Sequence, residues 1–193
     1  MVIVIATVTL FLIKENFLRT NTEDKFKTSL EQEEVSLLKG NIILNNKING
    51  KAIEVEVEDI YGKKIQLNDL RSKSPKLVYF YSELTCDVCV DQSFEYFNNF
   101  IDKAGVENAI VLVESKDPSY ITTLIRLNHI RTKNIFRVTK KNIDPENRGF
   151  FFLLDQSPIM HHTFFPMKEI PDVTDAYFKN LDQTFDLPSS RKI

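Results

Sequence analysis

The sequence predicts an α/β fold in which a central, mixed β-sheet is flanked by helices. Apolar runs typical of buried strands alternate with helical patterns, which favours parallel strands joined by helices. Two further runs, at 150–154 and 159–165, are separated by a polar turn and predict an antiparallel hairpin. The chain has 193 residues, of which 42% are hydrophobic and 27% charged, so it can bury a core of its own. This length fits one domain with an appendage better than two full domains.

The N-terminal region contains a short apolar run, Val2 to Ile13, that stops at Lys14. This run is shorter than the roughly 20 residues of a membrane span, and it lacks the flanking features of a cleavable signal. We interpret residues 1–19 as a membrane anchor or a truncated signal anchor, with a buried strand as the alternative. Residues 20–50 are expected to form a helical stalk and linker, in which an amphipathic helix from Thr20 ends at Gly40.

Residues 51–188 contain the strand and helix patterns of the main domain, and residues 189–193 form a tail. Ile53, Val55 and Val57 alternate with glutamates, which predicts a half-buried strand that turns near Gly62 and returns as an N-terminal β-hairpin. The other elements are expected in a fixed order: strand 77–81, a helix from the cysteine segment to Lys103, strand 109–113, helix 118–128, strand 135–138, strands 150–154 and 159–165, and a helix from Asp172 to about Phe185.

The charge balance argues against a nucleic-acid-binding protein, and the absence of sequence repeats argues against a repeat protein. The 25 lysines and arginines are balanced by 27 aspartates and glutamates, giving a formal net charge of −2. Binding to a phosphate backbone requires a basic surface, so nucleic acid is not an expected partner. No segment recurs at a period typical of solenoids or propellers.

The spacing of the two cysteines, Cys86 and Cys89, is the strongest indication of function in the sequence. A disulfide between them would close too short a loop to stabilise the fold much, so their spacing favours reactivity. They stand where a buried strand passes into a helix, and the N–H groups of the first helical turn favour a thiolate at Cys86. Cys89 follows one turn later and is placed to resolve a mixed disulfide. The exchange requires no metal and no bound cofactor.

The same region resembles the TlpA-like periplasmic thioredoxins. The segment from Glu58 to Leu70, E-D-I-Y-G-K-K-I-Q-L-N-D-L, is similar to the segment that precedes their redox site, and L-V-Y-F-Y followed by C-D-V-C is similar to their strand and redox motif. The resemblance covers about residues 51–188. It implies a thioredoxin fold, Cys86 as the attacking thiol, Cys89 as the resolving thiol, and protein thiols or disulfides as partners. It also implies a bacterial inner-membrane location, with the domain facing the periplasm.

Substrate-binding positions follow from the resemblance. The family has an aromatic residue before the first cysteine, where this chain has Thr85. The family also has a cis-proline about six residues before the aspartate at the end of a later strand, and the main chain of this proline receives the substrate segment. Counted back from Asp155, the corresponding position here is Gly149. We therefore assign substrate binding to Thr85, Gly149 and Phe150.

Acidic residues beside the cysteines indicate the direction of electron flow. Glu83 and Asp87 flank Cys86, and negative charge nearby disfavours a thiolate. A less stabilised thiolate makes the dithiol a better electron donor, so we expect a reductant rather than a strong oxidant.

Three other interpretations remain open. A metal could bind the cysteines with one of His129, His161 and His162, as in thioredoxin-fold copper chaperones. A peroxidase would need a proline and a threonine around its cysteine, and only the threonine is present. The third is a non-catalytic thioredoxin-fold binding module with a vestigial cysteine pair. Gly149 in place of the family's proline, and Asp87 between the cysteines, favour it.

Overall fold

The computed structural model describes residues 30–85, 87–138 and 148–187, with residues 87–89 described by their main chain alone. The chain consists of two compact units, residues 1–42 and 43–193. The predicted anchor, residues 1–19, lies outside the described residues. Of the helices that are described, none has the length and apolar character needed to cross a membrane.

A helix covers residues 30–48, so the predicted helix end at Gly40 is wrong. A single internal glycine lowers helix stability by only about 1 kcal/mol relative to alanine. Beyond that glycine, Leu44 and Ile48 are buried, at 7% and 1% exposure, and their packing compensates for this cost. Tertiary contacts therefore continue the helix where the local sequence favours a stop.

Within the described residues, the second unit contains one seven-stranded mixed sheet with the order β2-β1-β5-β4-β3-β6-β7. The central strands β3, β4 and β5 are parallel. β1 and β6 pair antiparallel with β5 and β3, and the edge strands β2 and β7 pair antiparallel with β1 and β6. The predicted N-terminal hairpin is confirmed as β1 paired with β2. The strands are β1 (Glu56–Asp59), β2 (Lys64–Gln66), β3 (Lys76–Ser82), β4 (Ala109–Glu114), β5 (Ile135–Val138), β6 (Phe150–Leu154) and β7 (His161–Phe164).

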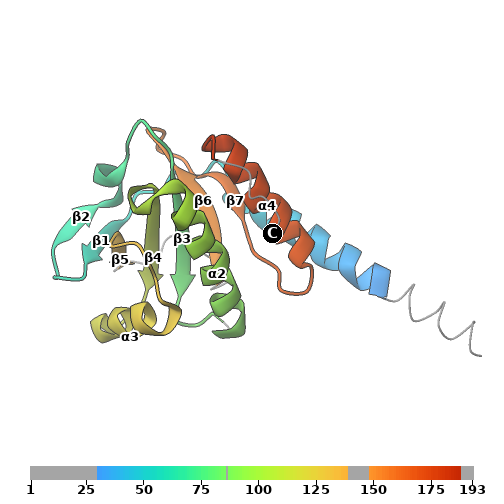
Figure 1. The fold of residues 1–193 in the computed structure, drawn as a ribbon, viewed down its shortest axis with the longest axis horizontal. Coiled ribbons are helices and arrows are strands. Elements are labelled where there is room, and N and C mark those ends of the chain that lie inside the picture. The colour runs from blue at the N-terminus through green and yellow to red at the C-terminus, as the bar shows by residue number, and fades with distance from the viewer. Residues whose placement is uncertain (1–29, 86, 139–147, 188–193) are drawn as a thin grey trace, which may run out of the picture. The chain divides into compact units, whose positions relative to one another are not determined.

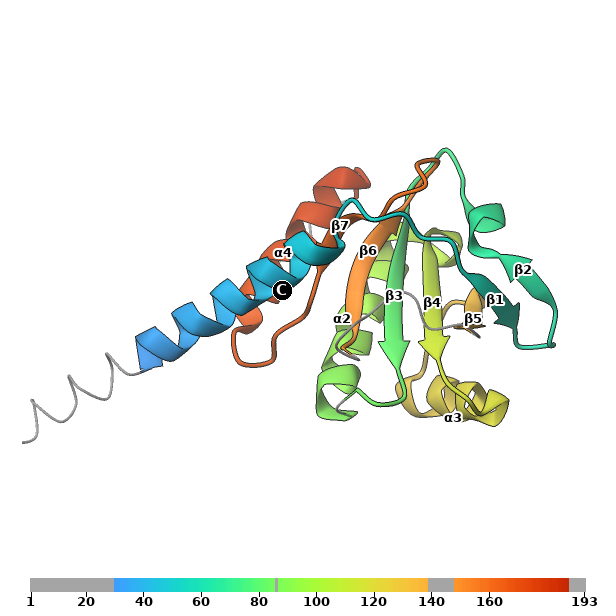
Figure 2. The ribbon, with the colours of Figure 1, turned by 180° about the vertical axis from the view of Figure 1, so that it is seen from behind.

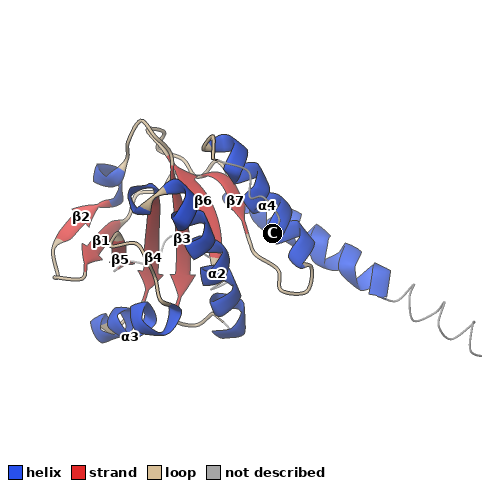
Figure 3. Ribbon diagram, in the orientation of Figure 1, coloured by secondary structure: helices blue, strands red, loops and turns tan. Residues whose placement is uncertain are grey.

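Helices α2 (Asp87–Ala104), α3 (Pro118–Asn128) and α4 (Pro171–Thr184) pack on one face of this sheet. Figures 1 and 3 show α2 in front of the sheet and α3 below the arrow tips of the central strands, and Figure 2 shows the opposite face. The short 3-10 helices η1 (Leu67–Leu70) and η2 (Val106–Asn108) connect elements. α4 begins at Pro171 rather than Asp172, since proline is favoured at the first helical position.

Two hydrophobic cores lie on the two faces of the sheet, and β3 contributes to both. Leu77, Tyr79 and Tyr81 point to the helix-covered face, while Val78 and Phe80 point to the other. All five are at most 1% exposed. This explains why the strand is a continuous apolar run, since a strand that is buried on both sides has no polar face.

Candidate active site

The cysteine pair lies at the transition from β3 to α2. β3 ends at Ser82 and α2 begins at Asp87. Cys86, which lies outside the described residues, immediately precedes the helix in sequence, and Cys89 is its third residue. The predicted strand-to-helix context of the motif is therefore confirmed. Free N–H groups of a first helical turn favour negative charge, and Cys89 belongs to that turn.

A turn of three residues connects β3 to the cysteines. The Thr85 N–H donates to the Ser82 carbonyl at 2.8 Å, and the Glu83 N–H donates to the Glu114 carbonyl at 3.0 Å. The second bond extends the pairing of β3 with β4 by one residue. Thr85 is half-buried in this turn, which leaves part of its surface open beside the motif.

Ser115 fixes the carboxylate of Glu83. Its hydroxyl donates to Glu83 Oε2 at 2.5 Å and accepts the Asp117 N–H at 3.0 Å. Ser115 itself is only 6% exposed. Glu83 follows β3 and Ser115 follows β4. Because these two strands are parallel, both residues lie at the end of the sheet from which the chain continues to the cysteines.

Asp117 caps α3 at this same end of the sheet. Its carboxylate accepts the Ser119 hydroxyl at 2.7 Å and the Ser119 N–H at 2.8 Å. These bonds lower the pKa of the Asp117 carboxyl below its ordinary value, the hydroxyl having the larger effect. Two carboxylates, Glu83 and Asp117, are therefore held by hydrogen bonds at the end of the sheet that leads to the cysteines.

Gly149 lies beside the C-terminal end of β3, since Phe80 pairs with Phe150 in the adjoining strand. A Cβ atom built on Gly149 would lie 2.7 Å from the Tyr79 hydroxyl oxygen, well inside van der Waals contact. The absence of a side chain at this position is thus explained by Tyr79. The hydroxyl occupies the space that a larger residue at position 149 would need.

Phe150 faces the core that lies away from the helices. It is fully buried, and its ring centroid lies 5.2 Å from that of Phe80 and 5.1 Å from that of Phe165. The structure thus brings Gly149 and Phe150 beside the strand that leads to Thr85, with the Phe150 side chain in the core. The substrate-binding role of Thr85, Gly149 and Phe150 stays a prediction.

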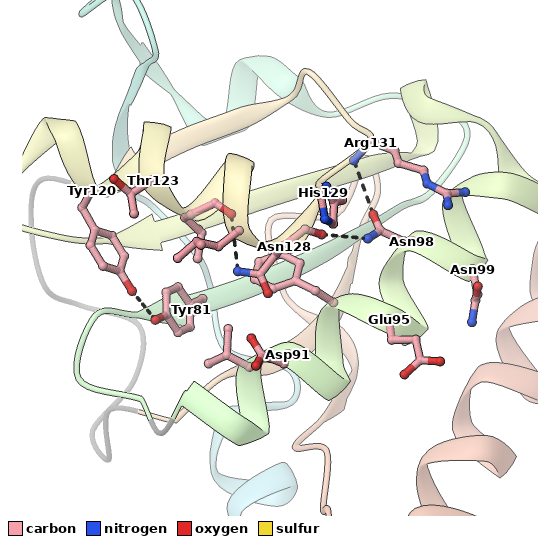
Figure 4. Close-up of a pocket in the computed structure, with 14 residues that line it drawn as sticks. Tyr81, Asp91, Glu95, Asn98, Asn99, Tyr120, Thr123, Asn128, His129 and Arg131 are labelled. Atoms are coloured by element: carbon pink, nitrogen blue, oxygen red, sulfur yellow. Dashed lines mark hydrogen bonds between the residues drawn. The ribbon is translucent and has the colours of Figure 1, made fainter.

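A cleft between α2 and α3 was not predicted from the sequence. Its volume is about 680 Å³, and Tyr81 and Tyr120 lie at one end of it, with their hydroxyl groups hydrogen-bonded to each other (Figure 4). Their rings are stacked, with centroids 6.2 Å apart.

Ser115 and Asp117 were also not predicted as part of the site. Their place in the sequence, directly after a predicted parallel strand, could have indicated them, because ligand sites in α/β sheets form at the carboxyl ends of parallel strands.

The histidines are dispersed among the described elements. His129 ends α3 in a left-handed conformation, with φ of 49°, whereas His161 and His162 belong to β7. Within the described ranges, no three His, Cys, Asp or Glu residues form a group that could hold a metal ion.

No protein-family model matches the chain, and no curated protein matches it. Solved structures do match. A candidate protein disulfide isomerase from Bacteroides thetaiotaomicron gives a TM-score of 0.51 at 11% identity, covering 72% of this chain and 90% of that chain. The peroxidoxin BcpB from Mycobacterium tuberculosis gives 0.50 at 13% identity, covering 70% and 97%.

The chain has a thioredoxin-like fold. The thioredoxin domain of a thiol-disulfide oxidoreductase from Bacteroides vulgatus also matches, with a TM-score of 0.49 at 12% identity, covering 67% of this chain and 97% of that chain. At 11% and 13% identity, the first two matches show the fold alone, and the resemblance to the TlpA-like group stays a prediction.

Proposed function

We propose that the protein is a thiol-disulfide oxidoreductase in which Cys86 attacks and Cys89 resolves. The supporting observation is the position of the C-x-x-C motif. It spans the start of α2, the helix that follows the buried strand β3 of a thioredoxin-like fold. A thiol at a helix N-terminus is acidified by the helix dipole, and the thiolate is the reactive form.

The exchange occurs in two balanced steps. The Cys86 thiolate attacks one sulfur of a partner disulfide, forming a mixed disulfide and releasing the other partner sulfur as a thiolate, which takes up a proton. Cys89 then loses its proton and attacks the Cys86 sulfur. This forms the Cys86–Cys89 disulfide and releases the second partner thiol. Two electrons pass from the dithiol to the partner, and no cofactor participates.

Substituting each cysteine separately tests this order of attack. We expect Cys86→Ser to abolish reduction of insulin disulfides by the reduced protein. Cys89→Ser should instead accumulate a mixed disulfide, because the resolving thiol is absent. Turbidity of precipitating insulin chains measures the first effect, and mass spectrometry under non-reducing conditions measures the second. Activity of Cys86→Ser equal to that of the unmodified protein would contradict the proposal.

The proposed direction is reduction of the partner. Glu83 stands three residues before Cys86 and is held by Ser115, and negative charge near a thiol opposes its thiolate form. We expect a reduction potential closer to the roughly −270 mV of thioredoxin than to the roughly −120 mV of the strong oxidant DsbA.

Removing the Glu83 charge should make the protein more oxidising. Glu83→Gln keeps an oxygen that can accept the Ser115 hydroxyl while it removes the charge, so the thiolate gains stability and the potential rises. Glu107→Gln is the matched control, because Glu107 is exposed and precedes β4, at the opposite end of that strand. Equilibration with glutathione buffers measures both potentials. An unchanged or more negative potential in Glu83→Gln would refute this reasoning.

We also propose that residues 1–19 anchor the protein in a bacterial inner membrane, with the domain facing the periplasm. The apolar run from Val2 to Ile13 and the resemblance to TlpA-like proteins support this placement. Membrane fractionation with and without residues 1–19 tests it.

One observation favours a second candidate, a non-catalytic binding module. The Tyr79 hydroxyl fills the space beside Gly149, where thioredoxins receive their substrate at a proline. The cysteine substitutions separate the two functions, because a binding module would show no difference between Cys86→Ser and the unmodified protein.

A further inference from the structure

The cleft between α2 and α3 has a size and position suited to a protein segment. Its volume of about 680 Å³ is within the range of ligand sites, roughly 300–1,000 Å³. Val90, which follows Cys89 directly in the sequence, lines it together with Tyr81. The cleft therefore begins beside the turn of α2 that contains the resolving cysteine.

Hydrogen bonds fix both ends of the cleft. At one end the Tyr81 and Tyr120 hydroxyls bond to each other (Figure 4). At the other, Asn98 Nδ2 donates to the Asn128 carbonyl at 3.2 Å, and Asn98 Oδ1 accepts the Arg131 N–H at 3.3 Å. These bonds join α2 to α3 and to the segment after it, so the cleft exists before any ligand binds.

The α2 wall of the cleft is negatively charged. Asp91 and Glu95 line it from successive turns of α2, both are exposed, and within the described residues neither forms an ion pair. Arg131 also lines the cleft, but its guanidinium pairs with Asp102 on α2. Like charges at positions i and i+4 of a helix repel each other, and a bound cation would remove that repulsion.

The opposite wall of the cleft is partly apolar. Leu127 on α3 lines it and is 67% exposed, and Tyr120 contributes part of an aromatic ring. A lysine or arginine side chain has a cationic end and a long apolar stem. It can place its charge against Asp91 and Glu95 and its stem against Leu127, which no acidic or purely apolar side chain can do.

We propose that this cleft binds a lysine- or arginine-rich segment of the partner protein, the one whose disulfide is reduced by the cysteine pair. The binding of a basic segment does not depend on the proposed function. Only the statement that this segment lies next to a disulfide to be reduced rests on it. An extended chain advances about 3.3 Å per residue, so basic residues within a few positions of the partner cysteine can reach the cleft.

Binding of peptides without cysteine tests the cleft independently of the redox chemistry. The probe is an eight-residue peptide of alternating lysine and serine, titrated into the full chain by calorimetry at low salt. We expect Asp91→Asn combined with Glu95→Gln to weaken binding about fourfold or more, since each exposed ion pair contributes a factor of about two to five. The same peptide with glutamate in place of lysine should not bind.

A matched double variant controls for net charge. Glu107→Gln combined with Glu169→Gln removes two exposed negative charges outside the residues that line the cleft, and should leave binding within twofold of the unmodified protein. Thermal unfolding confirms that each variant is folded. Equal weakening in both double variants, or equal binding of the lysine and glutamate peptides, would overturn the proposal.

A kinetic measurement relates the cleft to the disulfide. Between two disulfide-linked peptides that differ only in flanking lysine or glutamate, we expect kcat/KM to favour the lysine peptide, and the preference to disappear in the Asp91→Asn, Glu95→Gln variant. If no variant or substrate shows cysteine-dependent reduction but the lysine peptide still binds the cleft, the oxidoreductase proposal fails and the peptide site remains. A lysine preference that persists without Asp91 and Glu95 would overturn the peptide site alone.

Discussion

Replacing Phe151 by alanine should lower the free energy of unfolding by about 3–5 kcal/mol. Phe151 is fully buried in β6. Its ring stacks on Tyr79 with centroids 4.5 Å apart and meets Phe178 edge to face at 5.1 Å. It also lies near Phe97 on α2, at 6.2 Å. The truncation would therefore open a cavity among β3, α2 and α4.

Chemical denaturation measures this loss, and an exposed aromatic residue provides the comparison. Tyr61 is 88% exposed in the turn of the N-terminal hairpin, so Tyr61→Ala should change stability by less than about 0.5 kcal/mol. A loss below about 1 kcal/mol for Phe151→Ala would mean that the surrounding rings close the cavity, and that the packing described for this core is wrong.

Several elements could be predicted from the sequence because local pattern and burial agree. Phe150 to Leu154 is an uninterrupted apolar run, and all five residues are buried in β6. Asp117 is the N-cap of α3 and Pro118 is its first residue, a pair that marks a helix start in the sequence. The extent of helix 30–48 could not be predicted in this way, because Leu44 and Ile48 are held by contacts with residues distant in sequence.

The candidate site was predictable only in part, for the same reason. The C-x-x-C motif is local in sequence, and so is its position at the start of α2. The bond between Ser115 and Glu83 joins residues 32 positions apart, and the bond between Tyr81 and Tyr120 joins residues 39 apart. Neither pair has a spacing that marks it in the sequence. The first follows from the parallel pairing of β3 and β4, and the second from the packing of α3 on the helix-covered face of the sheet.

Replacing Gly149 by alanine should destabilise the protein by about 1–3 kcal/mol, which is the usual cost of overpacking a core. The new Cβ would lie 2.7 Å from the Tyr79 hydroxyl oxygen. Tyr79 cannot readily move away, because it is 1% exposed and packed between Phe94 and Phe151. The φ angle of Gly149 lies outside the left-handed region, so without the contact an alanine would stabilise by about 0.4–1 kcal/mol.

A double-mutant cycle with Tyr79→Phe assigns this cost to the contact. Removing the hydroxyl leaves ring carbons at 3.2 and 3.3 Å from the new Cβ, which small shifts can accommodate. Gly149→Ala should therefore cost less in the Tyr79→Phe background than in the unmodified protein, with the difference measured by chemical denaturation. Equal costs in both backgrounds would show that something other than Tyr79 excludes a side chain at position 149. If the cycle does show coupling, the Tyr79 hydroxyl is the group that keeps position 149 free of a side chain.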